Sequence, residues 1–259
     1  KKFLTIYLVT CWQAVFSADV YVAINGSNSN AGDAPGYKNA YATIAHAISQ
    51  MSYGDTCYVQ AGTYHEVVDL SSKKGLTITA YGDGPVLMDG TTALPSKWTQ
   101  HANDIYKLTY TANDPWQLFQ NRALMINARW PNAYLHDDTA WHMESHWARI
   151  NSSETTLKTK MVDSATDHSD LSALSFSIQN AIAVLNVGSF KSYTREVTAH
   201  TIGSNIFNVN AVKTLKSKEQ FYFLEGKLEF LDSAREWFFD SNTNTIYLWV
   251  PGGGPPTGD

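Results

Sequence analysis

Apolar side chains recur with a helical period near the start of the chain and then switch to an alternating one. Between residues 41 and 54 they stand at positions i, i+3, i+4 and i+7, which is one face of a short amphipathic helix. The stripe consists of Ile44, Ala47, Ile48 and Met51. After a Gly-Asp turn the apolar positions alternate, which predicts short strands over residues 56–59 and 66–70 with a corner at residues 62–63.

The spacing of the strand centres carries more information than any single strand. The centres fall near Tyr58, Val68, Ile78 and Leu87, at steps of 10, 10 and 9 residues. Such steps leave no room for a helix between parallel strands. They fit a solenoid with coils of roughly 20 to 30 residues, and an antiparallel meander gives similar spacing. The preceding helix favours the solenoid, because an open solenoid end needs a cap over its core.

Three segments together carry a resemblance to a known superfamily. They are residues 21–23 with the following Gly/Asn/Asp-rich loop, residues 41–68 with their G-D-T-x-x-V-x-x-G-T-Y-x-E pattern, and residues 78–90. They resemble the amino-terminal cap and first coils of secreted right-handed parallel β-helix proteins, the pectate-lyase-like superfamily with its β-helical glycoside hydrolases. The resemblance implies an all-β fold, a right-handed parallel β-helix with a capping helix, and a polysaccharide as substrate. It indicates the fold more specifically than the reaction.

The regular spacing ends after Gly90, and the rest of the chain indicates a different organisation. Residues 19–97 are predicted to form the cap and first coils, residues 98–220 an inserted antiparallel β-domain, and residues 221–250 strands that return to the β-helix. The Pro/Gly-rich residues 251–259 are typical of a linker or a truncated end. Because β-helix enzymes of this kind continue for many more coils, we expect the reaction centre to lie partly outside this sequence.

Composition and the first residues narrow the functional class. The net charge is −5 and the basic residues are scattered, which argues against a nucleic-acid partner. Residues 1–18 read as a secretory signal peptide, so the protein is expected to be secreted or periplasmic and free of the membrane once the signal is removed. Only Cys57 would then remain, which excludes an internal disulfide. We expect a monomer.

The strongest polar and aromatic cluster lies between residues 129 and 149. We predict that its substrate-binding residues are Arg129, Trp130, His136, Trp141 and His142, and the carboxylates considered for catalysis are Asp138 and Glu144. An Arg beside an indole suits a sugar carboxylate or sulfate. A strand over residues 142–146 would place its two histidines on one face, for a metal or a sugar ridge, and a solvated strand face is the alternative.

Other sites are less clearly indicated by the sequence. The loop of residues 25–36 offers Asp33 as a calcium ligand, with a metal-free solvated loop as the alternative, and no other cofactor is expected. Glycoside hydrolysis needs two carboxylates, but no spacing selects a pair, and Glu66 with Asp69 is a further option. The sequence therefore predicts a glycoside hydrolase acting on a complex glycan, acidic glycans included. The alternatives are a non-catalytic carbohydrate-binding or adhesion protein, and a polysaccharide lyase.

Overall fold

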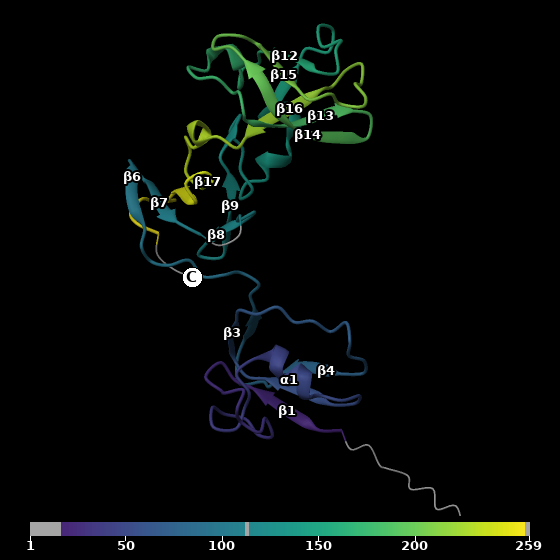
Figure 1. Cartoon of the computed structure of the whole chain (residues 1–259), viewed down its shortest axis with the longest axis vertical. Helices are drawn as coiled ribbons and strands as arrows, with labels where there is room; N and C mark the ends of the chain where they lie inside the picture. The colour runs from purple at the N-terminus through teal and green to yellow at the C-terminus, as the bar shows by residue number, and fades with distance from the viewer. Residues whose placement is uncertain (1–16, 112–113, 257–259) are drawn as a thin grey trace, which may run out of the picture. The chain divides into compact units, whose positions relative to one another are not determined.

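The fold is all-β, with two α-helices in the part of the chain that the structure describes. A computed structural model describes residues 17–111 and 114–256. Sixteen of the residues assigned to the signal peptide therefore lie outside the described residues. Two compact units divide the chain, unit 1 over residues 1–94 and unit 2 over residues 95–259 (Figure 1).

Unit 1 contains the predicted helix and two small parallel sheets. The helix α1 spans Ile44–Gln50, and the hydroxyl of Thr43 accepts a hydrogen bond from the His46 N–H at its start. Its apolar stripe is buried against the sheet, which confirms the periodicity argument. The sheets are β1-β2-β4 (Asp19–Val22, Thr56–Val59, Thr77–Ala80) and β3-β5 (Gly62–Tyr64, Val86–Met88).

The predicted right-handed parallel β-helix is wrong as the architecture of the described residues. Parallel pairing in unit 1 ends with the two small sheets. The next strand, β6 (Thr99–Ala102), turns back on β7 (Ile105–Thr109) after two residues, and so short a connection permits only antiparallel pairing. Every other strand pair of unit 2 is antiparallel except β9 with β17.

The strand predicted over residues 66–70 is also absent, because Glu66 has another role. Its two carboxylate oxygens each accept a backbone hydrogen bond at 2.8 Å, one from Ile44 and one from Ala45. These donors belong to the first turn of α1, where N–H groups lack partners within the helix and a negative charge is favourable. Glu66 therefore closes the helix start from a distant part of the chain, which removes it from the candidate catalytic carboxylates.

Replacing Glu66 by glutamine should lower the free energy of unfolding of unit 1 by about 1 to 2 kcal/mol, because a charged acceptor of two hydrogen bonds is lost. Thermal unfolding followed by circular dichroism measures the change. Asp69→Asn is the matched control, since the Asp69 carboxylate only closes a local turn to the Ser71 N–H. Equal losses in the two variants would contradict the role of Glu66 at the helix start.

Unit 2 is built around a closed six-stranded antiparallel barrel. The strands pair around a ring in the order β16-β11-β12-β15-β14-β13, and β13 pairs with β16 to close it. A barrel of this kind leaves no free sheet edge, so its backbone donors and acceptors are satisfied within the ring. The bounds are β11 Ala148–Ile150, β12 Lys160–Ser164, β13 Ile182–Gly188, β14 Lys191–His200, β15 Ile206–Val209 and β16 Phe221–Glu225.

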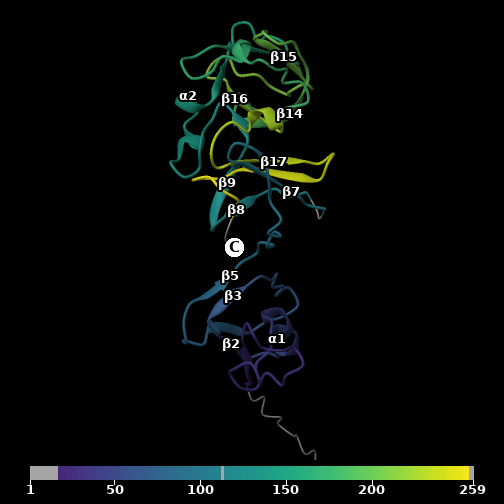
Figure 2. The ribbon, with the colours of Figure 1, turned by 90° about the vertical axis from the view of Figure 1, so that its left-hand side faces the viewer.

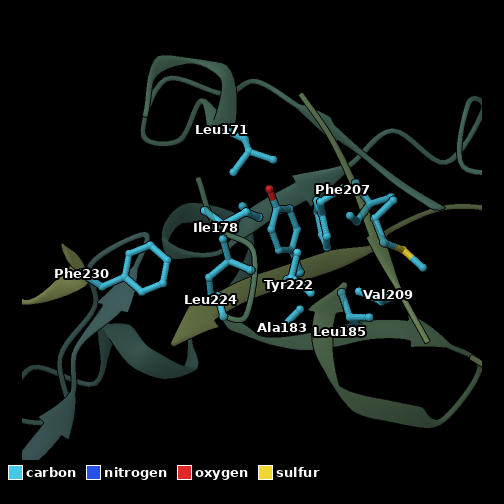
Figure 3. Close-up of a cluster of buried hydrophobic side chains, with 14 of the residues drawn as sticks. Leu171, Ile178, Ala183, Leu185, Phe207, Val209, Tyr222, Leu224 and Phe230 are labelled. Carbon is cyan, nitrogen blue, oxygen red and sulfur yellow. The ribbon is translucent and has the colours of Figure 1, made fainter. Parts of the chain in front are cut away.

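The barrel interior is filled by alternate side chains of its strands. Phe207, Tyr222 and Leu185 converge there and are fully buried (Figure 3). The Tyr222 hydroxyl donates to the Asp163 carboxylate at 2.8 Å, so the polar groups inside the barrel are paired. β16, which the sequence assigned to strands returning to a β-helix, is thus a barrel strand.

A six-stranded sheet completes unit 2 beside the barrel, in the order β6-β7-β18-β17-β9-β8 (Figure 2). Its remaining strands are β8 Leu118–Gln120, β9 Ala123–Asn127, β17 Glu236–Asp240 and β18 Thr245–Trp249. The two-residue strand β10, Arg129–Trp130, follows β9 and pairs with β16, so one chain segment links the sheet to the barrel.

Short helical turns fill the loops of unit 2. They are η1 Thr139–Trp141, α2 Met143–His146, η2 Leu171–Ala173 and η3 Leu228–Phe230. The described residues contain no helix with the length and apolarity that a bilayer crossing requires.

Candidate functional site

A pocket of about 370 Å³ opens in unit 2 where β9 and β10 run from the sheet to the barrel. Its walls come from β9, β10, β16, β17 and the segment of residues 135–147. The lining is predominantly apolar, with five aromatic and five aliphatic residues, and four polar side chains are set among them. The aromatic lining residues are Trp116, Trp141, Trp147, Phe223 and Trp237, and the polar ones of interest are Asn127, Arg129 and Glu225.

Strand pairing brings the polar groups of the pocket together. Arg129 on β10 stands directly opposite Glu225 on β16 in the antiparallel ladder. Side chains of directly opposed residues lie on the same face of a sheet, and so do residues two apart on one strand. Asn127 therefore joins Arg129, and Phe223 joins Glu225, on the pocket side. The Asn127 amide lies 3.5 Å from a Glu225 carboxylate oxygen.

The Arg129 guanidinium is held rigidly although it lines the pocket. Its Nε donates to the Pro131 carbonyl at 3.0 Å, and its Cζ lies 3.9 Å from the centroid of the Phe223 ring. The Trp147 ring flanks it at 5.8 Å. Cation–π contacts and a fixed Nε leave the guanidinium few alternative positions. The residue is 3% exposed, so the cation is set into the wall of the pocket.

The two tryptophans of residues 135–147 are placed differently. Trp147 is fixed, because its indole N–H donates to the Ala140 carbonyl at 2.9 Å and its ring meets Phe223 edge-on with centroids 4.7 Å apart. Trp141 is 71% exposed at the pocket. An indole that remains largely exposed retains most of its apolar face for a ligand.

Two carboxyl groups near Arg129, the half-buried Glu225 and the buried Glu236, have raised pKa values. Burial raises the pKa of Glu225, which lines the pocket, against the opposing effects of Asn127 and Arg129. Burial and nearby Asp232 raise the pKa of Glu236 to about 8. Glu236 does not line the pocket; its oxygens accept from the backbone N–H groups of Arg129, Asp232 and Ser233 at 3.2 to 3.3 Å. It therefore positions the backbone behind the site.

These raised pKa values predict that unit 2 is more stable at mildly acidic pH than at alkaline pH. The folded state holds protons on Glu225, Glu236 and Asp163 more tightly than the unfolded chain, so unfolding releases protons. The free energy of unfolding should fall by about 1 to 3 kcal/mol between pH 5 and pH 8, in the window from the ordinary carboxyl pKa up to that of Glu236. Urea unfolding at pH 5, 6.5 and 8 measures it.

The Glu236→Gln variant is the control for this pH dependence. It loses acceptors for backbone donors and should be less stable at pH 5, but its stability should fall less steeply between pH 5 and pH 8 than that of the native chain. A native chain whose stability rises over this range would contradict the raised pKa values.

Of the site residues predicted from the sequence, some line the pocket, one packs against the barrel and the others are exposed on the surface. Arg129 and Trp141 line the pocket. Trp130 points to the barrel instead, packing against Tyr222 with ring centroids 6.1 Å apart. His136 is exposed beside the Tyr134 ring. Asp138 and Glu144 are exposed on the turns around η1 and α2 and do not line the pocket.

The structure does not align the residues that were considered as metal ligands in the way the sequence suggested. Residues 143–146 form one helical turn, so the strand that would have aligned His142 and His146 is absent; their rings lie 6.3 Å apart. Asp33 is an exposed loop residue. Across the described residues, no group of three or more His, Cys, Asp and Glu side chains is arranged to hold a metal ion.

Several lining residues were not singled out by sequence reasoning. The largest omissions are Glu225, Asn127 and Phe223, which join the site only through the pairing of β10 with β16 and the alternation of side chains. The alternation itself is visible in the sequence, since Asn127 and Arg129 are two residues apart, as are Phe223 and Glu225. The pairing of segments almost a hundred residues apart is not visible there.

Comparison with known proteins shows a shared fold. No protein-family model matches the chain, and no curated protein sequence does either. A solved structure titled "Glycoside hydrolase" is similar over 92% of this chain, with a TM-score of 0.65 and 16% sequence identity. This chain spans 44% of that protein's length. A second structure, "The complex structure of XylC with xylose", matches with a TM-score of 0.32 and 17% identity, over 80% of this chain and 31% of that one.

Proposed function

We propose that this chain binds a glycan in the tryptophan-lined pocket of unit 2, as the substrate-recognising part of a glycoside hydrolase that acts on a complex glycan. The observation that carries the proposal is the lining itself: four indole rings surround the buried Arg129 and the Glu225 carboxyl. The fold shared with a protein titled glycoside hydrolase supports the same class of function.

The chemistry of the lining suits sugars better than purely apolar ligands. A sugar ring has C–H faces that stack on indoles and hydroxyl edges that need donors and acceptors. The pocket supplies both, because Asn127 and Arg129 donate while Glu225 accepts. Its volume of about 370 Å³ falls within the usual range of small-ligand pockets, about 300 to 1,000 Å³.

Non-catalytic glycan binding is the second candidate, and one observation favours it. Glycoside hydrolysis uses two carboxyl groups across the scissile bond. Among the described residues, Glu225 is the only Asp or Glu that lines the pocket. Hydrolysis at this place therefore requires a second carboxyl group from outside the present lining, whereas binding requires none.

The proposal includes the extracytoplasmic location that the first residues suggest. A positively charged start followed by an apolar run is the pattern of a secretory signal. A secreted protein would encounter complex glycans outside the cytoplasm. Detection of the protein in the culture medium or periplasm of its host tests this part separately.

A panel of oligosaccharides tests the proposed function. Titration calorimetry should find binding of at least one neutral or acidic oligosaccharide to the folded chain, and product analysis should show whether reducing ends are released. Binding with release supports the hydrolase, and binding without release supports the second candidate. Absence of binding across the panel would refute the proposal.

A further inference from the structure

The Arg129 guanidinium has an unused donor at the pocket. Its Nε is bound to the Pro131 carbonyl, and its Nη2 is buried with no hydrogen-bond partner among the described residues. A buried N–H group without a partner is costly, more so on a charged group. Arg129 lines the pocket although Nη2 itself has almost no accessible surface, so a ligand there reaches this donor by shifting one of the rings that cover the guanidinium.

The nearby carboxyl groups do not satisfy this donor. Both Glu236 oxygens are engaged by backbone N–H groups, and neither Glu236 nor Glu225 forms a hydrogen bond with Nη2. Glu225 is instead within reach of the Asn127 amide. Although burial lowers the pKa of Arg129 to about 10, the guanidinium is a cation at neutral pH. A cation in an aromatic wall therefore lacks an anion in direct contact.

The same aromatic surroundings increase the value of an anionic partner. Phe223 and Trp147 cover the guanidinium and keep water from much of it. Charge-assisted hydrogen bonds strengthen where water is excluded, and a guanidinium matches the planar oxygens of a carboxylate or the oxygens of a sulfate. A neutral hydroxyl would satisfy Nη2 geometrically but would leave the charge unbalanced.

We propose that Arg129 Nη2 binds the carboxylate or sulfate of an acidic sugar residue, whose ring lies against the exposed Trp141. This inference rests on the proposed glycan-binding function and adds the substrate class. The ionised form of Glu225 weakens this preference, because its negative charge beside the guanidinium reduces the attraction for a second anion.

Matched sugars test the inference with the native chain. The probes are the methyl glycosides of glucose and galactose, their uronic acid counterparts, and their 6-sulfates, measured by calorimetry at pH 7. We expect at least one acidic sugar to bind about tenfold or more tightly than its neutral parent. The stronger of the uronide and the sulfate identifies the anionic group. Equal binding of acidic and neutral sugars would overturn this inference alone, while absence of any binding would overturn the proposed function with it.

Two variants test the assignment to Arg129 through the ratio of acidic to neutral affinity. Because burial raises the pKa of Glu225, the native chain and Glu225→Gln are compared at pH 8, where removing the negative charge of the carboxylate should raise this ratio about threefold or more. Arg129→Lys keeps a cation but loses the planar fork, and should lower the ratio about threefold or more. Circular dichroism first establishes that each variant is folded. If Arg129→Lys is unfolded, Glu225→Gln still decides, because an unchanged ratio there would contradict an anion bound at Arg129.

Discussion

Replacing Phe207 by alanine is expected to lower the free energy of unfolding of unit 2 by about 3 to 5 kcal/mol. Phe207 is fully buried inside the closed barrel, where its ring lies 5.2 Å from that of Tyr222. A barrel closed on all sides cannot collapse around the lost volume as readily as an open sheet, so most of the cavity should persist.

Urea unfolding followed by tryptophan fluorescence measures this loss, because every tryptophan of the described residues lies in unit 2. Phe190→Ala is the matched control. Phe190 is fully exposed at the turn between β13 and β14, so its removal should change stability by less than about 0.5 kcal/mol. Similar losses in the two variants would contradict the closed, filled barrel.

Replacing Trp141 by alanine is expected to lower glycan affinity by about 10- to 100-fold while leaving stability nearly unchanged. Trp141 lines the pocket but is largely exposed, so its ring contributes little to the packed core. Large aromatic side chains dominate binding energies where they meet a ligand, which is why the expected effect is strong.

Calorimetry with the tightest oligosaccharide of the panel measures the effect of Trp141→Ala. Phe190→Ala again serves as the control, since it removes an even more exposed aromatic ring away from the pocket lining. If Trp141→Ala binds as tightly as the native chain, or loses stability together with affinity, the pocket does not bind glycans through this ring.

The local features that the sequence predicts well are those set by neighbouring residues. The helix over residues 44–50 follows from its apolar stripe, and the strand at residues 56–59 follows from alternation and β-branched or aromatic residues. The all-β class, which the family resemblance implies, agrees with the structure, whereas the β-helix does not. Such patterns act within one element and require no knowledge of its partners.

The β-helix prediction fails because strand spacing does not determine strand direction. The parallel partners that follow α1 in unit 1 lie 21 and 24 residues apart, as in Thr56 with Thr77 and Gly62 with Val86, and no strand forms around Val68. The chain then makes tight reversals such as the one at Asn103, which has a positive φ of 47°. Antiparallel ladders follow from that point. The prediction ended the coil period at Gly90, but it still returned residues 221–250 to a β-helix, whereas β16 belongs to the barrel and β17 and β18 to the six-stranded sheet.

The candidate site was only partly visible for a related reason. Arg129 and Trp141 stand out by residue type in a short stretch of sequence, and both line the pocket. Glu225 looks like the end of an ordinary strand until β16 pairs with β10. Glu66 shows the opposite case, in which a carboxylate of interest turns out to bind the start of a helix.

The most direct test of the central claim, that a glycan binds in this pocket, is a nitrogen-15 NMR titration of the tryptophan indole N–H signals. Single Trp→Phe variants assign the signals of Trp116, Trp141 and Trp147. Addition of the bound oligosaccharide should shift the Trp116 and Trp141 signals most, because these indoles are exposed at the pocket, with a smaller shift for Trp147. The signal of Trp249, which is not part of the lining, should stay in place. Binding that shifts Trp249 and leaves Trp141 unmoved would contradict the account.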